Sequence, residues 1–139
     1  MPFVNEILAY RSVSIAGLEK NTGKTESLNY VLNRLKTMNT CIALTSIGVD
    51  GEKTDQVTRS PKPEITVYEG MIFVTSEKHY LERKIISEIL DVSQERTALG
   101  RLITARARMQ GKVILSGPSG TAEVRKLIEN MELQLFNPD

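Results

Sequence analysis

The most constraining feature of this sequence is a glycine-containing loop that joins a short apolar run to an amphipathic segment. Residues 12–17 (SVSIAG) form the apolar run, and a polar loop follows over residues 18–23. In residues 24–38 apolar side chains recur at helical spacing, as in a helix with one buried face. A second apolar run occupies residues 40–47. This order predicts one βαβ unit with parallel strands and a right-handed crossover.

The rest of the chain continues to alternate strand-like and helix-like patterns, which favours an α/β fold. Glu69-Gly70 predicts a two-residue hairpin turn between strands at 65–68 and 71–74. Periodicity predicts the later elements: a helix at 80–90, a half-exposed strand at 102–109, a buried strand at 112–116 and a helix at 120–131. We therefore expect a single domain over residues 1–139, with a mainly parallel sheet, flanking helices and at least one β-hairpin.

Composition narrows the classes of protein to which the chain can belong. Its 139 residues suit one domain, and 18 Lys+Arg against 17 Asp+Glu give a net charge of +1, which argues against a basic nucleic-acid-binding surface. One Cys (Cys41) and one His (His79) exclude an internal disulfide and a multi-Cys zinc site. No segment approaches the roughly 20 apolar residues of a membrane span, and residues 1–11 lack the basic start of a secretory signal. We expect a cytoplasmic protein without nucleic-acid or membrane partners.

The loop after the first predicted strand carries the pattern of a phosphate-binding loop. Five residues separate Gly17 from the triplet Gly23-Lys24-Thr25, one more than in the commonest form of the motif. Gly23 lets the backbone approach a phosphate, and consecutive N–H groups at a helix N-terminus attract an anion. Lys24, the predicted catalytic residue, would neutralise phosphate charge, and the Thr25 hydroxyl would bind Mg²⁺. The predicted nucleotide-binding residues are Gly17, Asn21, Thr22, Gly23, Lys24, Thr25 and Glu26. The alternatives are a chance match and a loop that binds nucleotide without catalysis.

Two acidic residues after the second predicted strand are candidates for a further metal ligand. Asp50 and Asp55 lie in a long polar segment, residues 48–63, and loops of this length inside a domain are usually functional. Ligands in open parallel sheets bind beyond the carboxyl ends of the strands, so an Asp here would hold Mg²⁺ opposite Thr25. We place Asp50 first, as metal ligand and catalytic residue, because it is nearer the strand end, with Asp55 as a second metal ligand. The alternative for both residues is a solvated acidic loop.

The pattern Gly-x₅-Gly-Lys-Thr after a first strand resembles the SIMIBI class of P-loop proteins, and residues 12–30 carry the resemblance. Within this class the sequence is similar to dethiobiotin synthetase and the cobyrinic acid diamide synthases. The resemblance implies ATP, with GTP as the alternative, and Mg²⁺ held by an acidic residue in the region of Asp50 and Asp55. Some dimeric ATPases of the class carry a signature Lys five residues before the P-loop lysine. This chain has Glu19 there, so a lysine acting in trans is not implied.

Two parts of a complete domain of this class are not found. No apolar strand ends in an acidic residue, because residues 113–115 are followed by Ser-Gly-Pro. Residues 116–120 (SGPSG) begin like another phosphate loop but lack its lysine, and they predict a structural turn before a helix, with ligand contact through Ser119 or Thr121 as the alternative. The chain also stops after a helix, where a further parallel strand is expected. We interpret it as the N-terminal portion of a longer protein, truncated at its C-terminus; a short subunit completed by a partner is the alternative.

A narrower resemblance rests on residues 45–52 (TSIGVDGE), 68–70 (YEG) and 115–120 (LSGPSG). Together they are similar to the P-loop subunits of lysine 5,6-aminomutase reactivases, which implies ATP-driven exchange of damaged adenosylcobalamin on a mutase. We predict Mg-dependent ATP or GTP hydrolysis by a reactivase-like or chaperone-like subunit, with a protein partner or as a homodimer. The alternative is a small-molecule kinase or ligase of the dethiobiotin synthetase type, acting on a carboxylate or carbamate. The sequence identifies no general base.

Overall fold

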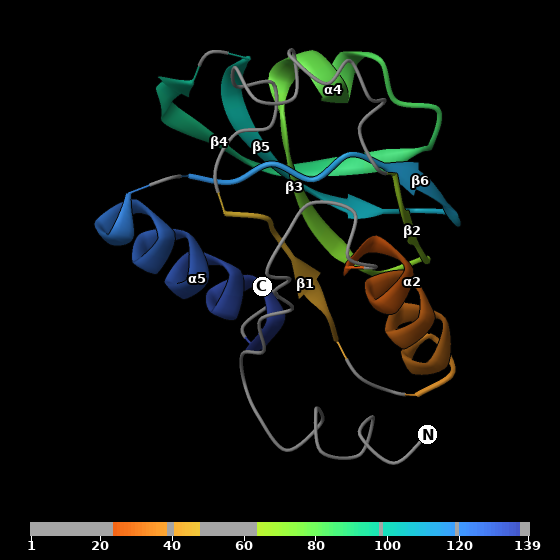
Figure 1. The fold of residues 1–139 in the computed structure, drawn as a ribbon. Coiled ribbons are helices and arrows are strands. Elements are labelled where there is room, and N and C mark those ends of the chain that lie inside the picture. Colours follow the sequence, from red (N-terminus) through yellow and green to blue (C-terminus); the bar gives the residue numbers. More distant parts are fainter. Residues whose placement is uncertain (1–23, 39–40, 48–63, 98, 119, 137–139) are drawn as a thin grey trace. The chain divides into compact units, whose positions relative to one another are not determined.

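The structure is a computed structural model that describes residues 24–38, 41–47, 64–97, 99–118 and 120–136 (Figure 1). The chain divides into two compact units, Met1–Thr40 and Cys41–Asp139. In the first unit the described element is helix α2 (Lys24–Leu35). The second unit holds two sheets together with helices α4 (Glu77–Leu81) and α5 (Thr121–Phe136). The architecture of the described residues is therefore mixed α/β.

Helix α2 forms where the sequence predicts a helix, but it ends about one turn earlier. Its buried side chains, Val31, Leu32 and Leu35, recur at helical spacing. Glu26 in the first turn and Arg34 in the last turn complement the helix dipole. After Leu35 the chain turns. Residues 36–38 were predicted to be helical, but they are not.

Four strands form the larger sheet, in the order β1-β3-β5-β4. They are β1 (Ala43–Leu44), β3 (Ile72–Ser76), β5 (Gly100–Ala107) and β4 (Ser87–Thr97). β1 and β3 are parallel, whereas β3–β5 and β5–β4 are antiparallel. The prediction of a mainly parallel sheet is therefore wrong for the described strands, because the sheet is mixed. The physical reason is the short link from β4 to β5, since parallel neighbours need a crossover of a dozen or more residues.

The predicted βαβ unit is described only in part. Its second strand, expected over residues 40–47, is short and consists of β1 alone. Its first strand, expected over residues 12–17, lies outside the described residues. The parallel partner that the structure gives β1 is β3, with Ala43 opposite Ile72 and Leu44 opposite Phe73.

A second, two-stranded antiparallel sheet pairs β2 (Ile65–Val67) with β6 (Gly111–Val113). The predicted hairpin between residues 65–68 and 71–74 is therefore wrong. The turn itself forms, because Gly70 has φ +91° and the Met71 N–H donates to the Tyr68 carbonyl at 3.0 Å. This turn connects β2 of the smaller sheet to β3 of the larger sheet. β2 instead buries its apolar face with β6, which matches the predicted strand at 112–116 but is shorter.

The predicted helix at 80–90 is also wrong. α4 ends at Leu81, and residues from Ser87 onward belong to β4. The Ser76 hydroxyl caps α4 by accepting the His79 N–H at 3.4 Å. Beyond the helix, pairing with β5 decides the conformation, and the β-branched isoleucines of this segment fit a strand.

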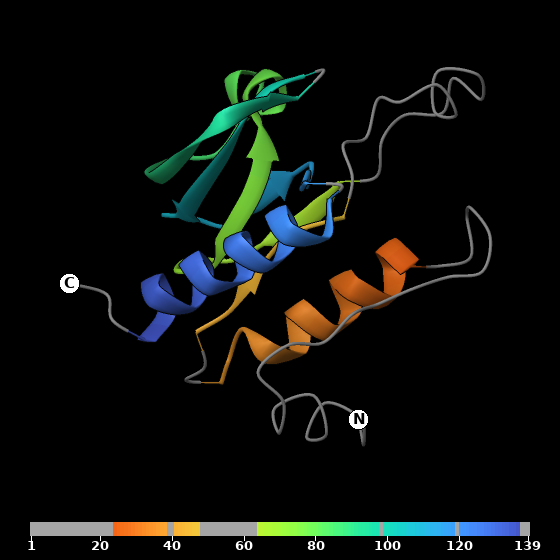
Figure 2. The same cartoon turned by 90° about the vertical axis from the view of Figure 1, so that its left-hand side faces the viewer.

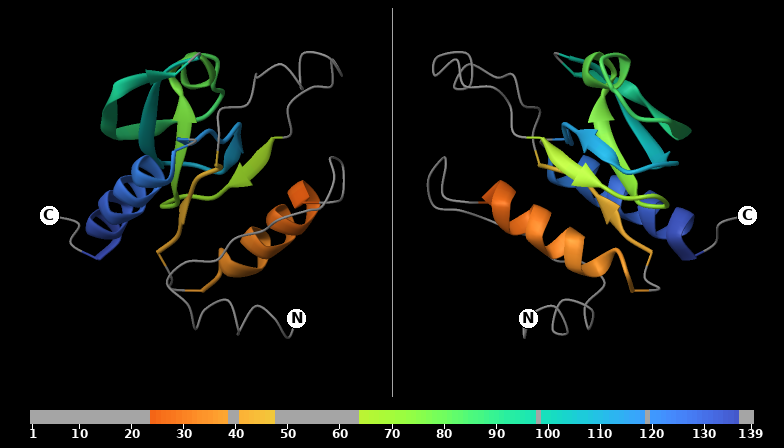
Figure 3. Two further views of the ribbon diagram at one scale, coloured as in Figure 1. Left: turned by 60° about the vertical axis from the view of Figure 1, so that its left-hand side comes forward. Right: turned by 90° about the vertical axis from the view of Figure 1, so that its right-hand side faces the viewer.

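Helix α5 lies along one face of the larger sheet (Figure 2), and the views from other sides agree (Figure 3). Its contact with the sheet forms a cluster of buried side chains with three partly buried neighbours: Ile72, Val74, Leu102 and Met131, with Ala43, Leu90 and Leu127. The helix matches the prediction at 120–131 and continues to Phe136. Because side chains alternate across a strand, Phe73 and Ile103 face the opposite side.

The strand predicted at 102–109 forms as β5, but it is not half exposed. Thr104, expected on a polar face, is 2% exposed. It lies opposite Val74, on the face that α5 covers. Of the three polar residues in the alternating pattern, Thr104 is therefore buried, Arg106 is half-buried and Arg108 is exposed. The alternation does not mark a solvent-exposed face.

Candidate nucleotide-binding site

The described part of the candidate site is the first turn of α2. The helix begins at Lys24, immediately after Gly23 in the sequence, and continues through Thr25 and Glu26. N–H groups in the first turn have no partner within a helix, so they attract anions. Thr25 is half-buried and Glu26 is exposed. Because the carboxylate of Glu26 repels a phosphate, its predicted contribution to nucleotide binding would come from its backbone N–H.

The other predicted site residues lie outside the described part of the chain: Gly17, Asn21, Thr22, Gly23, Asp50 and Asp55. Of the predicted site residues the structure therefore describes Lys24, Thr25 and Glu26, which are adjacent in the sequence, and their contact with the acidic residues stays a prediction. Within the described ranges, no three His, Cys, Asp or Glu side chains gather closely enough to hold a metal ion. The Mg²⁺ ligands stay predictions.

A second polar region lies in the second unit, at the carboxyl end of β1. The Thr45 hydroxyl is 3.0 Å from the carbonyl oxygen of Ser46 and 3.1 Å from that of Ser116, and it can donate to either. The Ser116 N–H donates to the Val74 carbonyl at 3.0 Å. Residue 116 is therefore bonded to the segment that leaves β1 and also to β3. This end of the parallel pair is where ligands bind in open α/β sheets.

Gly117 holds the same two segments close together. A Cβ built on this glycine would overlap the carbonyl oxygen of Ser46 and would lie 2.7 Å from the Thr45 hydroxyl oxygen. Only a residue without a side chain fits this approach. Thr45, Ser46, Ser116 and Gly117 are named the β1 clamp below. In the sequence, Thr45 and Ser46 precede the polar segment 48–63, and Ser116 and Gly117 precede α5.

Two buried hydroxyl groups, one of them the clamp residue Ser116, were not predicted as features of a site. Thr75 is 2% exposed and Ser116 is fully buried, and neither hydroxyl has a hydrogen-bond partner among the described residues. A buried hydroxyl without a partner costs about 1–3 kcal/mol, so such groups are uncommon in stable folds. The sequence signal for both is a Ser or Thr directly after an apolar run. That signal is too common to single them out.

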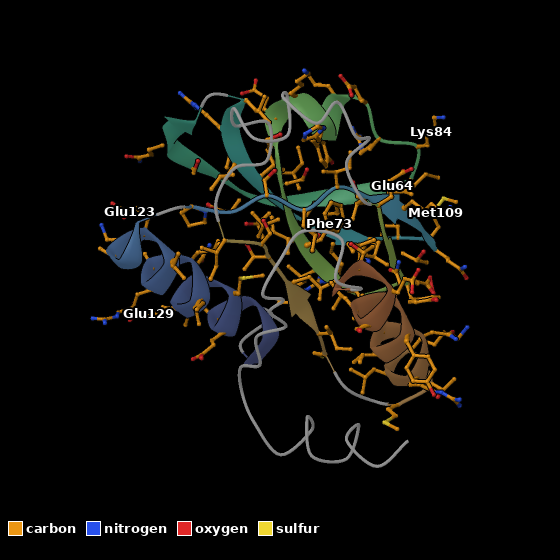
Figure 4. The ribbon with its side chains drawn as sticks, in the orientation of Figure 1. Glu64, Phe73, Lys84, Met109, Glu123 and Glu129 are labelled. Atoms are coloured by element: carbon orange, nitrogen blue, oxygen red, sulfur yellow. The ribbon has the colours of Figure 1, made fainter. Side chains whose placement is uncertain are left out.

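The segment 116–120 leads into α5, and its N-terminus already has a negative charge beside it. The Glu123 carboxylate lies against Gly120, where a Cβ on the glycine would overlap its oxygen. Figure 4 shows Glu123 at the start of the helix and Glu129 projecting outward further along it. An anionic ligand here would meet the Glu123 charge, which favours the structural turn over ligand contact through Thr121. Ser119, the other candidate, lies outside the described residues.

The chain's one cysteine and one histidine, Cys41 and His79, both lie in the described residues. Cys41 is exposed, because it precedes β1 and is not part of it. His79 lies within α4 and is half-buried, with both ring nitrogens buried. Neither residue lies in the first turn of α2 or in the β1 clamp.

Comparison of the chain with models of known protein families, with curated proteins and with solved structures finds no significant match. None of the helices in the described residues is long and apolar enough to cross a membrane. The function is therefore argued from the residues themselves.

Proposed function

We propose that this chain binds a nucleoside triphosphate, ATP with GTP as the alternative, together with Mg²⁺ through residues 17–25. The nucleotide would drive a reactivase-like or chaperone-like subunit that acts on a protein partner. One observation carries the proposal: α2 begins at Lys24. Lys24 and Thr25 of the Gly-Lys-Thr triplet thus lie in the first described turn of the helix, as a phosphate loop requires, whereas Gly23 lies outside the described residues.

The chemistry follows from charge and position. The first-turn N–H groups of α2 and the Lys24 ammonium would neutralise the terminal phosphates, and the Thr25 hydroxyl would hold Mg²⁺. Asp50, with Asp55 as the alternative, would complete the metal site. Mg²⁺ supplies charge neutralisation between the phosphates when bound. Phosphoryl transfer needs little else from the protein, because positioning and electrostatics account for most of its catalysis.

The two longer described helices differ in how well they suit an anion. Both have a glutamate as their third residue, Glu26 in α2 and Glu123 in α5. Glu123 lies back against Gly120, whereas Glu26 is exposed to solvent. α2 alone of the two begins with a lysine. This contrast supports α2 as the phosphate-binding helix.

The first test is calorimetric titration of the chain with MgATP and MgGTP. We expect binding at micromolar strength, about −8 kcal/mol, for one of the two nucleotides. Lys24→Ala should weaken it at least tenfold, which corresponds to about 1.4 kcal/mol. The matched control is Lys36→Ala, which removes an exposed lysine just beyond the other end of α2 and should leave binding unchanged. Absence of nucleotide binding, or equal binding by the Lys24 variant, would refute the proposal.

A turnover assay separates the two function classes. A partner-driven subunit should release ADP slowly on its own, at a rate that small carboxylates do not change. A kinase or ligase of the dethiobiotin synthetase type should instead turn over only when a carboxylate or carbamate acceptor is present. Strong acceptor dependence would exclude the reactivase-like role while leaving the nucleotide site intact.

A further inference from the structure

β4 lies at the edge of the larger sheet and presents apolar side chains to solvent. Among the described strands it pairs with β5 alone. Ile89 is 50% exposed and Val92 is 40% exposed, and Ile86, just before the strand, is 67% exposed. Edge strands carry unpaired N–H and C=O groups and readily pair with another chain, so natural proteins seldom leave apolar ones uncovered.

The hydrogen bonds of the neighbouring strand β5 show which backbone groups of β4 face outward. The N–H of Arg108 donates to the Ile86 carbonyl at 2.9 Å, and the N–H of Leu102 donates to the Ser93 hydroxyl at 2.9 Å. The even-numbered residues of β5 therefore face β4. Ala107 faces the other way, because its N–H donates to the Met71 carbonyl at 2.8 Å. The odd-numbered residues of β5 thus face β3.

Ile89 and Val92 are the residues of β4 opposite Ala105 and Ile103. Because those two β5 residues bond toward β3, both cross-strand pairs are of the non-hydrogen-bonded type. In such a pair the N–H and C=O groups of each residue point away from the partner strand. The backbone groups of Ile89 and Val92 therefore face the free edge.

The irregularity between Ile89 and Asp91 places Ile89 and Val92 on the same face of β4. At that point β4 advances two residues while β5 advances one, from Ala105 to Thr104. This is the count of a β-bulge. Ile89 and Val92, three residues apart, consequently share both the outward backbone direction and the sheet face opposite α5. Ser87, opposite Ala107, also faces its backbone outward, so the edge is apolar at two of the positions where it can bond.

We propose that β4 pairs antiparallel with β4 of a second copy of this chain, about a two-fold axis at the bulge, where Leu90 and Asp91 together occupy one register position. Ile89 then lies opposite the partner's Val92, and Val92 lies opposite the partner's Ile89. Both are hydrogen-bonded pairs, so apolar contact and backbone bonding coincide. A second copy fits because the edge is self-complementary under the two-fold axis, as an isologous interface requires.

The same axis brings Asp91 opposite the partner's Asp91, which opposes association. The Asn130 side chain draws the Asp91 carboxylate toward α5, with Nδ2 3.4 Å from its oxygen. The like charges are therefore partly turned from the axis, and they limit the strength of the dimer. Removing the charge with Asp91→Asn should tighten it about two- to five-fold, since like charges directly opposite on paired strands are modestly destabilising.

Sedimentation equilibrium of the full chain over about 5–500 µM tests the pairing at concentrations where weak dimers form. We expect a monomer–dimer equilibrium that Ile89→Arg abolishes. The matched control is Leu133→Arg, which places the same charge at a 58% exposed leucine on α5 and should leave the equilibrium unchanged. A monomer at every concentration overturns the proposal, as does a dimer that Ile89→Arg does not weaken. Circular dichroism confirms that each variant is folded.

Disulfide trapping tests the register. In a Cys41→Ser background, Asp91→Cys should cross-link two chains under mild oxidation, because opposed residues of a non-hydrogen-bonded pair have Cα atoms about 4.5 Å apart. Glu88→Cys in the same background should not, since two-fold related residues at this position are offset by roughly 13 Å along the strands. Cross-linking at residue 88 but not at residue 91 would overturn this register. Because these readouts need no nucleotide, they stand or fall independently of the proposed function.

Discussion

Replacing Gly117 with alanine should open the β1 clamp. The added Cβ would overlap the carbonyl oxygen of Ser46, lying 2.8 Å from the carbon of the same group. A backbone carbonyl cannot rotate aside as a flexible side chain would. The two segments must therefore separate, which lengthens the contact of 3.1 Å between the Thr45 hydroxyl and the Ser116 carbonyl.

The magnitude follows from two terms. Forcing a methyl group into close-packed structure costs about 1–3 kcal/mol. Loss of one intramolecular hydrogen bond adds about 1 kcal/mol. We therefore expect Gly117→Ala to lower the free energy of unfolding by about 2–4 kcal/mol, a large part of the 5–15 kcal/mol typical of a domain. At roughly 4 °C per kcal/mol for a chain of this size, the melting temperature should fall by about 8–16 °C.

Urea unfolding followed by circular dichroism and by tyrosine fluorescence measures this change. Tyr80, at 5% exposed, reports on the second unit, where the clamp lies. The control is Gly70→Ala: Gly70 has φ +91°, but a Cβ there would meet nothing within 4 Å. It should cost only the left-handed backbone strain, about 1–2 kcal/mol. If Gly117→Ala changes stability by less than about 0.5 kcal/mol, or costs less than Gly70→Ala, the close approach to Ser46 is not a feature of the folded protein.

Two further predictions concern the second unit. Phe73→Ala, at a fully buried position in β3, should lower the free energy of unfolding by about 3–5 kcal/mol through the cavity it leaves, as measured by urea unfolding. Glu123→Ala should cost about 0.3–1 kcal/mol, because it removes a negative charge from the N-terminus of α5, whereas Glu129→Ala in mid-helix should be nearly neutral. If both glutamate variants behave alike in the same assay, Glu123 does not stabilise the helix terminus.

Segments that the sequence predicts correctly are those whose structure is decided locally. α2 and α5 each combine an apolar stripe with acidic first turns, so spacing alone identifies them. The turn at Glu69-Gly70 is correct for the same reason, because a glycine supplies the positive φ. The partner of β2 is not local. A tight turn predicts that the chain reverses, but only packing decides that β2 pairs with β6 and not with β3.

The candidate site likewise has features that neighbouring residues decide and features that depend on residues far apart in the sequence. The order Gly-Lys-Thr and the helix that starts at Lys24 are both properties of neighbouring residues, so the sequence predicts them. The β1 clamp joins Thr45 to Ser116 across 71 positions of the chain. Each residue by itself is an ordinary polar residue at the end of an apolar run. Nothing in the linear pattern indicates that the two meet, or that Gly117 must lack a side chain.

The failed helix at 80–90 has a specific cause in the geometry of β4. Ile86, Ile89 and Val92 are each three residues apart, a spacing typical of one face of a helix. In the structure the bulge after Ile89 inserts an extra residue, so Ile89 and Val92 share one face of the strand, whereas Ile86 precedes the bulge and falls on the other face. The pattern is helical in period, but all three side chains are exposed, at 67, 50 and 40%. A helix would bury such a stripe against its own domain. An edge strand with Ile89 and Val92 exposed on one face needs a second surface to cover them, and the Ile89→Arg experiment tests whether a second copy of the chain supplies it.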